Sequence, residues 1–205
     1  WLVSNISYGV VMQYSQDVLG QTVKTTWPDG SFATNTFDGT RLVKQTSRTG
    51  NETSHGFDLA GRRTSLTNSL GAVTQYFRDA AGNTTNVTDA LTNKTFFTFD
   101  PMNRLTVTTR PDGLKSTNTW DALGRLISKT GAGAVPVSYG YDQLSRMTNL
   151  VDGMTNSTAF TFDSLSRLTK KTYADGSFYQ YSYNARGWLT NRLDPMGRNT
   201  GYEYS

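Results

Sequence analysis

An aspartate returns at nearly constant intervals through this chain of 205 residues. In most copies an aromatic residue precedes the aspartate and an arginine follows four positions later, as in WDALGR at 120–125. Seven of the eight intervals between successive copies are 21 residues long, and the other is 20. The copies lie at Asp17, Asp38, Asp58, Asp79, Asp100, Asp121, Asp142, Asp163 and, in the same register, Asn184. Such a period is typical of repeat architectures, in which each unit is stabilised by its neighbours.

The composition favours many short strands over long helices. Apolar residues make up 36% of the chain, below the roughly 45 to 50% of ordinary domains. Aromatic residues reach 12%, which argues against disorder. Because the register is unbroken, we expect residues 1–205 to form one array of about nine repeats. The chain starts without Met and stops within a repeat, so we expect it to be a fragment of a longer protein.

The aspartate motif reads as a hairpin turn. Asp is favoured at the first position of a type I turn, and Gly at the fourth position tolerates a left-handed backbone. A three-residue loop with a bulge places the first and fifth residues opposite each other, so each Asp should pair with the Arg four positions later. The predicted turn residues are Asp58, Gly61 and Arg62; Asp100 and Arg104; Asp121, Gly124 and Arg125; Asp142 and Arg146; and Asp163 and Arg167.

A second turn signal follows about ten to twelve residues later in most units. In most of these units the signal is Asp-Gly or Pro-Asp-Gly. In one unit we expect a longer form of this turn. The examples are Pro28-Asp29-Gly30, Pro111-Asp112-Gly113, Asp152-Gly153 and Asp175-Gly176, with Asp194-Pro195-Met196-Gly197 as the longer form. Each unit is therefore predicted to contain two short strands and two turns.

Aromatic residues alternate in the strand that precedes each aspartate, as in Phe97 and Phe99 or Tyr181 and Tyr183. Alternate residues share one face of a strand, and this spacing favours a buried face over a platform for sugars. The better candidates for individual exposed contacts are Trp1, Trp27, Trp120 and Trp188. The predicted fold is all-β: a repetitive antiparallel β-hairpin meander that curls into a spiral sheet or part of a hollow β-shell, because the bulges add twist.

No constellation of catalytic residues is visible. His55 is the only histidine, and the chain has no cysteine, which removes Ser-His-Asp, Cys-His and most zinc arrangements. His55 takes an aromatic position of its repeat, so we predict a structural role. Every aspartate already belongs to a predicted turn. We therefore expect no catalytic residue, no cofactor, no metal and no enzymatic activity.

The charge and hydropathy patterns restrict the partners. The net charge of +4 is spread along the repeat without a basic run, so we expect no nucleic-acid binding. The sequence contains no stretch of 18 apolar residues, so we predict no membrane span in this segment.

The strings FDLAGRR, WDALGRL and YDQLSRM, which recur in register, resemble the Rhs or YD-repeat family over residues 14–205. Four positions depart from its pattern. Asn83 and Trp188 replace Arg, Asn184 replaces Asp, and Asp38 lies only three residues before Arg41. The resemblance implies an elongated sheet that spirals into a hollow shell.

Bacterial members of this family look like containers for a C-terminal toxin, whereas animal teneurins use related arrays in adhesion. By resemblance, we expect a non-catalytic wall segment of a secreted or cell-surface protein of bacterial origin. Its partners would be the other repeats of the chain and an enclosed C-terminal toxin. The alternative is an adhesion or carbohydrate-binding array that recognises cell-surface glycans.

Overall fold

The computed structural model describes residues 2–7, 10–131 and 133–204, and every regular element in them is a β-strand. The strands are β1 (Leu2–Ser7), β2 (Val10–Gln16), β3 (Thr22–Thr26), β4 (Phe32–Asp38), β5 (Arg41–Thr46), β6 (Glu52–Phe57), β7 (Arg63–Thr67), β8 (Val73–Arg78), β9 (Thr84–Thr88), β10 (Lys94–Phe99), β11 (Leu105–Thr109), β12 (Lys115–Trp120), β13 (Leu126–Gly131), β14 (Ala134–Tyr141), β15 (Met147–Val151), β16 (Ser157–Phe162), β17 (Leu168–Thr172), β18 (Phe178–Tyr183), β19 (Leu189–Leu193) and β20 (Asn199–Gly201).

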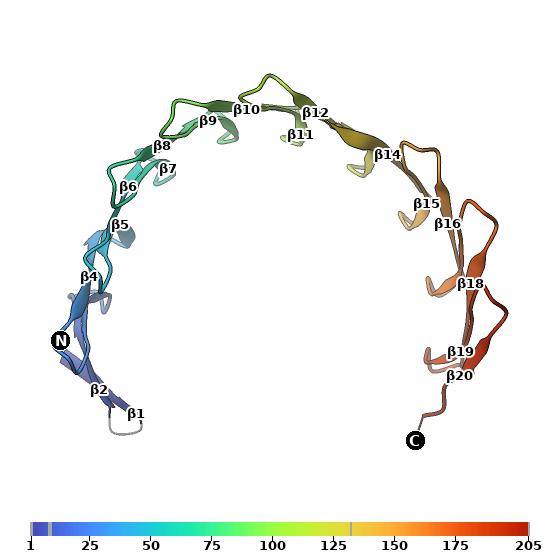
Figure 1. The fold of residues 1–205 in the computed structure, drawn as a ribbon, viewed down its shortest axis with the longest axis horizontal. Coiled ribbons are helices and arrows are strands. Elements are labelled where there is room, and N and C mark those ends of the chain that lie inside the picture. The colour runs from blue at the N-terminus through green and yellow to red at the C-terminus, as the bar shows by residue number, and fades with distance from the viewer. Residues whose placement is uncertain (1, 8–9, 132, 205) are drawn as a thin grey trace. The chain divides into compact units, whose positions relative to one another are not determined.

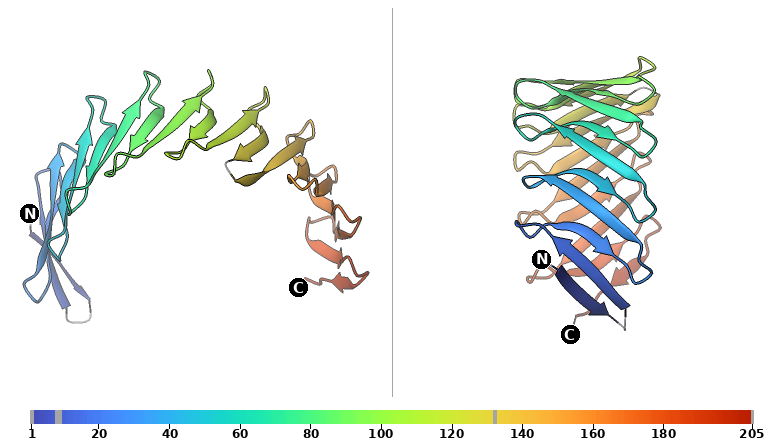
Figure 2. Two further views of the ribbon diagram at one scale, coloured as in Figure 1. Left: turned by 45° about the horizontal axis from the view of Figure 1, so that its top comes forward. Right: turned by 90° about the vertical axis from the view of Figure 1, so that its left-hand side faces the viewer.

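The chain divides into two compact units, Trp1–Phe97 and Thr98–Ser205. Within each unit, consecutive strands pair in antiparallel fashion, as β7 does with β8 and β17 with β18. Figure 1 shows the strands of each unit following one another in sequence order, in a row that bends, and Figure 2 shows the hairpin turns at the two edges of the row. The predicted all-β antiparallel meander is confirmed.

The aspartate motif forms a tight turn, here called the first turn of each repeat. In the turn between β12 and β13, the Asp121 N–H donates to the Arg125 carbonyl at 2.9 Å, and the Gly124 N–H donates to the Asp121 carbonyl at 3.1 Å. Gly124 has a φ of 81°, a conformation that glycine adopts without steric cost. Asn103, Ser145 and Ser166 hold this left-handed position in neighbouring repeats.

The second turn, at the opposite edge, has the same geometry. Between β11 and β12 the Arg110 N–H donates to the Leu114 carbonyl at 2.9 Å, and Gly113 has a φ of 80°. The turn opened by Asp194 repeats this pattern with a bond to the Arg198 carbonyl at 2.9 Å. The expectation of a longer form was wrong, because these turns differ only in where the aspartate lies.

The turn that follows β15 corrects a second detail of the sequence interpretation. Asp152 is the first residue of this turn, where its N–H donates to the Asn156 carbonyl at 3.0 Å. The left-handed position is held by Thr155, with a φ of 65°. The dipeptide Asp152-Gly153 therefore does not form the corner that Asp29-Gly30 forms, where Gly30 has a φ of 80°.

Bulges lie beside the first turns. The strand register shifts between Thr119 and Trp120 and again between Ser182 and Tyr183, whereas the pairing across the second turn from β17 to β18 has no shift. A bulge bends its strand and increases the local twist. One described second-turn pairing also shifts, between Lys129 and Gly131. The bulges thus concentrate at the first-turn edge, where they favour bending of each row.

The sheet is a single layer. Among the described residues, no apolar side chain is buried, and the only buried residue is Asp194, at 9% exposure. The paired aromatic residues that precede the aspartates, such as Tyr181 and Tyr183, are half-buried. The expectation that they form a buried face is not met in this chain, since no second layer in the described residues covers them. Cross-strand neighbours shield them instead.

Candidate functional site

In five first turns, those of Asp58, Asp100, Asp121, Asp142 and Asp163, the carboxylate accepts three hydrogen bonds. In the turn of Asp121, Oδ1 accepts the N–H groups of Leu123 and Arg125, both at 2.9 Å. The Nε of Arg125 donates to Oδ2 at 2.6 Å. The backbone bond from Arg125, followed by its side-chain bond, lowers the pKa of Asp121, because these bonds favour the charged carboxylate. One aspartate thus defines the turn and orients the arginine.

The oriented arginine also reaches the next repeat. The Nη1 of Arg125 donates to the backbone carbonyl of Asp142, 17 residues later, at 2.9 Å. Four such bonds join five successive turns of the second unit, at 2.9 to 3.0 Å. We call the set of pairs Asp100–Arg104, Asp121–Arg125, Asp142–Arg146 and Asp163–Arg167 the Asp-Arg ladder.

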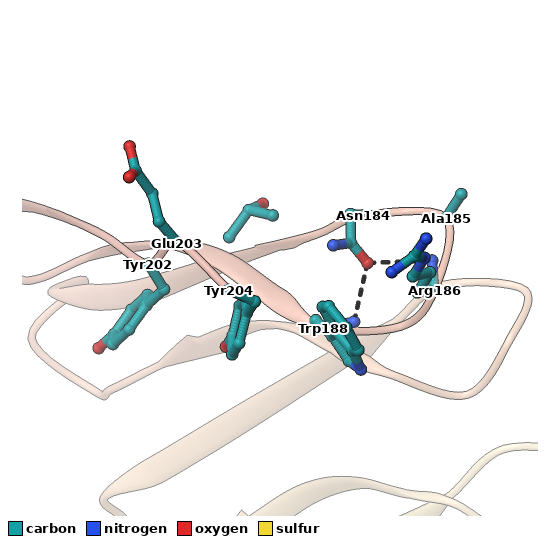
Figure 3. Close-up of a pocket in the computed structure, with 8 residues that line it drawn as sticks. Asn184, Ala185, Arg186, Trp188, Tyr202, Glu203 and Tyr204 are labelled. Atoms are coloured by element: carbon teal, nitrogen blue, oxygen red, sulfur yellow. Dashed lines mark hydrogen bonds between the residues drawn. The ribbon is translucent and has the colours of Figure 1, made fainter.

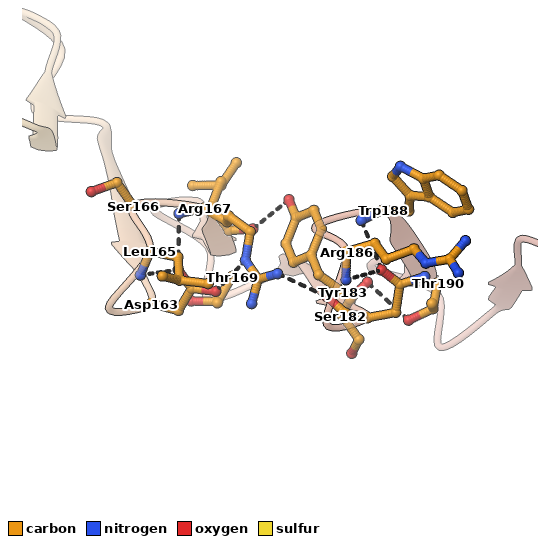
Figure 4. A network of polar contacts seen from close by, with 12 residues as sticks. Asp163, Leu165, Ser166, Arg167, Thr169, Ser182, Tyr183, Arg186, Trp188 and Thr190 are labelled. Carbon is orange, nitrogen blue, oxygen red and sulfur yellow. Dashed lines mark hydrogen bonds and ion pairs between the residues drawn. The ribbon is translucent and has the colours of Figure 1, made fainter.

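Where the residue before the turn is Tyr or Trp, its side chain makes a second link between repeats. The Tyr141 hydroxyl donates to the Leu126 carbonyl, 15 residues earlier, at 2.9 Å. The guanidinium of Arg125 lies over the Tyr141 ring, 4.8 Å from its centroid, in a favourable cation–π contact. Figure 4 shows the equivalent arrangement around Tyr183, whose hydroxyl donates to a carbonyl at 2.9 Å and whose ring lies 4.9 Å from the guanidinium of Arg167.

The ladder is partly shielded from solvent. Its eight charged side chains are 16 to 26% exposed. Their hydrogen-bonding groups are directed to the turns, so the arrangement fixes the relative position of successive hairpins. Within residues 2–7, 10–131 and 133–204, no group of His, Asp and Glu side chains could hold a metal ion. No helix of the described chain has the length and hydropathy to cross a membrane.

The predicted residues of the first unit form a less regular set. Asp58 pairs with Arg62 at 2.8 Å, and Gly61 has a φ of 76°. Asp38 pairs with Arg41 at 2.6 Å across the shortened loop. At the position where Arg is replaced, Asn83 donates its side-chain amide to Asp79 at 3.0 Å.

His55 lies in β6 opposite Leu66. Its ring centroid is 6.5 Å from that of Phe57, consistent with the aromatic position predicted from the sequence. Its Nδ1 is buried and has no hydrogen-bond partner among the described residues. Burial, followed by the charge of Arg63, lowers the pKa of His55.

The tryptophans proposed as exposed contacts behave differently from one another. Trp1 lies outside the described residues. Trp27 is half-buried beneath Arg48, whose guanidinium lies 5.1 Å from the ring centroid. The indole N–H of Trp120 donates to the Leu105 carbonyl at 3.0 Å, so Trp120 serves the same link as the tyrosines.

Trp188 takes the position of the ladder arginine and lines an open pocket of about 580 Å³. Its ring packs against that of Tyr204 with centroids 5.0 Å apart, and Arg186 lies over it at 5.3 Å. Figure 3 shows Trp188 and Tyr204 side by side, with Glu203 pointing the other way. Trp188 and Tyr204 are 39% and 49% exposed.

Sequence reasoning predicted the contact within each turn but missed both links between repeats. The spacing of the motif already indicated the link made by the arginine. An arginine four residues after one aspartate is 17 residues before the next, which is the separation of Arg125 from Asp142. The sequence does not show in which direction the guanidinium points. Its partner is a backbone carbonyl, which any residue could supply.

Solved structures with a similar fold come from toxin complexes. The chain matches TcdB2-TccC3-Cdc42 with a TM-score of 0.62 and 15% identity over 90% of its length. It matches the Photorhabdus luminescens Tc holotoxin pore with a TM-score of 0.63 and 16% identity, also over 90%. In both cases it spans only 14% of the solved chain. At this identity the likeness concerns the fold.

Sequence comparison supplies the family. No curated protein matches the chain. The family described as RHS Repeat matches residues 78–115 and 120–153, which include three turns of the Asp-Arg ladder. These two segments of the chain are RHS repeats.

Proposed function

We propose that this chain is a non-catalytic wall segment of a β-shell that encloses a C-terminal toxin. The observation that carries the proposal is the Asp-Arg ladder, in which charged groups that could serve chemistry or binding are bonded to adjacent turns. These bonds hold each hairpin in place against the next, as the wall of a shell requires. The likeness to TcdB2-TccC3, at a TM-score of 0.62, supports the same role.

Further parts of the proposal follow from the family. We propose that residues 1–205 form one array of about nine repeats within a longer protein, since the 21-residue register continues through both units. The partners would be other repeats of the same protein and the enclosed toxin. A secreted or cell-surface bacterial protein would fit this role.

The test uses the full-length protein that contains this chain. We expect its C-terminal region to resist limited proteolysis, followed by mass spectrometry, and to become sensitive when Arg125→Ala and Arg146→Ala are combined. The matched control is Arg110→Ala, an exposed arginine at the other edge that is not part of the ladder. Equal digestion of the C-terminal region in the wild type and the ladder variant would contradict the proposal.

The pocket at Trp188 favours a second candidate, the binding of cell-surface glycans. Exposed Trp and Tyr rings can stack on pyranose rings, and this aromatic pair lies in an open pocket of about 580 Å³. A glycan array probed with the wild type and Trp188→Ala tests it. A reproducible signal that the substitution abolishes would favour adhesion, and Trp120→Ala would control for loss of fold.

A further inference from the structure

Aromatic and cationic side chains gather on one face of strands β16 to β19 in the second unit. Lys171 lies opposite Phe160 on one neighbouring strand and opposite Tyr179 on the other, and Arg192 lies opposite Tyr181. Residues directly opposite each other in a sheet share a face. We call the half-buried residues Phe160, Lys171, Tyr173, Tyr179, Tyr181 and Arg192 the cationic patch.

Neither cation of the patch has an acidic partner in the described part of the chain, where other side chains make the ion pairs. The Nε of Arg192 is buried and has no hydrogen-bond partner there. The aspartates that follow the two cations in sequence are bonded inside their own turns. Asp175 accepts the Ser177 N–H at 2.9 Å, and Asp194 pairs with Arg198 at 2.7 Å. The two positive charges are therefore uncompensated.

The strands of the second unit supply no carboxylate to this face. All eight of its aspartates lie in hairpin turns at the edges of the sheet. Tyr202 lies two positions after Thr200, the residue opposite Arg192, so it shares the face of the patch. Figure 3 shows Glu203 pointing away from Tyr202. The face around the patch is thus positively charged.

The aromatic rings of the patch are partly covered by one another and by the cations. Tyr179 and Tyr181 are nearly parallel with centroids 6.4 Å apart, and Tyr173 meets Tyr179 edge-on at 6.3 Å. Lys171 lies 4.7 Å from the Tyr173 centroid, and Arg192 lies 5.9 Å from that of Tyr179. Proteins that bind single-stranded nucleic acids stack bases on free aromatic faces. This arrangement instead presents its charges to a partner.

The spacing of the two cations fits an extended peptide. They lie on either side of β18, opposite Tyr179 and Tyr181, which are two residues apart. Two strand spacings across the sheet and two residues along it place the backbones of Lys171 and Arg192 about 12 Å apart. In an extended chain, residues four positions apart point to the same side and lie about 13 Å apart.

We propose that the cationic patch binds an extended polypeptide segment that carries two acidic side chains four residues apart. One carboxylate pairs with Lys171 and the other with Arg192. Tyr and Arg are enriched at interfaces between proteins, and the tyrosines of the patch supply apolar area around the two charges. Because the charges lie near the surface, salt weakens the association.

The first test is an NMR titration of the chain at low ionic strength with three synthetic peptides. One has two glutamates four residues apart, the second has the same glutamates adjacent to each other, and the third has glutamines in their place. We expect the first peptide to shift the signals of β17 to β19. The glutamine peptide should bind at least about tenfold more weakly, and the peptide with adjacent glutamates should also bind more weakly than the first.

The second test compares two double variants that change the net charge equally. We expect Lys171→Gln with Arg192→Gln to raise the dissociation constant of the first peptide at least about tenfold. The control, Lys115→Gln with Lys170→Gln, lies outside the patch and should bind like the wild type. Circular dichroism verifies that both variants remain folded.

Three outcomes would overturn the proposal. The first is that the peptide with spaced glutamates does not bind, or binds no better than the glutamine peptide. The second is an equal loss of binding in the two double variants. The third is that a thymidine oligonucleotide of the same charge binds more tightly and depends on Lys171 and Arg192, which would assign the patch to nucleic acid.

Discussion

The two units of this chain build the same hairpins but connect them differently. In the second unit a single arginine position links five successive turns. In the first unit the links vary: the Gln21 amide donates to the Gly39 carbonyl at 2.8 Å, and the Arg48 Nε donates to the Ser31 hydroxyl at 2.6 Å. The second unit therefore repeats one link, whereas these two links of the first unit differ from it and from each other.

The exposure of the carboxylates follows this difference. The ladder aspartates are 16 to 24% exposed, whereas Asp58 is 27% and Asp38 is 66% exposed. Asp38 lies in the repeat with the 20-residue interval, where Arg41 follows one position early. The strands still pair there, with Asp38 opposite Arg41. Backbone pairing therefore tolerates a lost residue, while the ladder requires the full spacing.

The largest difference between the units is expected when an arginine is removed from each. Arg125→Ala loses the bond to the next turn, and one hydrogen bond from a charged group contributes roughly 1.5 to 3 kcal/mol. Arg62→Ala should cost less, because in the described part of the first unit Arg62 bonds only to its own turn. Hydrogen exchange should show two loosened turns, at 121–125 and 142–146, for Arg125→Ala and a single loosened turn for Arg62→Ala. Equal effects would remove the distinction between the units.

The next largest loss of stability is expected from a substitution at the left-handed position of a turn. Gly124→Val places a β-branched residue at a φ of 81°, which costs roughly 1 to 2 kcal/mol and should lower the melting temperature by about 2 to 8 °C. Ala122→Val in the same loop is the control, with no strained φ. An unchanged melting temperature for Gly124→Val would argue against the turn.

The hydrogen bond that links an aromatic residue to a neighbouring repeat can be removed at one position and added at another. Tyr141→Phe removes the bond to the Leu126 carbonyl, and we expect Phe162→Tyr to supply the equivalent bond to the Met147 carbonyl in the preceding repeat. Each change should shift the free energy of unfolding by roughly 0.5 to 1.5 kcal/mol, downward for the first and upward for the second. Urea titration measures both, and shifts of the same sign would contradict the link.

The smallest difference expected between the two units is in how their stability depends on pH. Since folding lowers the pKa of His55, its contribution is complete above the unfolded value of about 6.5 and is lost as the pH falls through the folded pKa. The ladder aspartates also have lowered pKa values, so their contribution persists to about pH 4 and is lost below it.

Hydrogen exchange as a function of pH checks this order. We expect peptides around β6 and β7 to lose protection first as the pH falls below about 6.5, while the ladder turns stay protected to about pH 4. His55→Tyr should abolish the early loss. Simultaneous loss of protection in both units would show that His55 does not set the response.

The sequence sufficed for the fold because its turn signals and its period are local. Asp121, Gly124 and Arg125 specify a turn whose geometry depends on five consecutive residues. The contacts between repeats and the state of the aromatic face were not predictable in this way. They depend on side-chain directions across a 21-residue interval and on whether a second layer exists, and neither is encoded in a local pattern.

The arginine of each ladder turn bonds to a main-chain oxygen of the next one, and this has an evolutionary consequence. Arg167 bonds to the carbonyl of Asn184 at 3.0 Å, as its counterparts bond to aspartates. Because the receiving group is the same for every amino acid, a gene segment encoding whole repeats can be duplicated, deleted or exchanged between genes without matching partner residues at the new junction. Only the step of 21 codons has to be preserved.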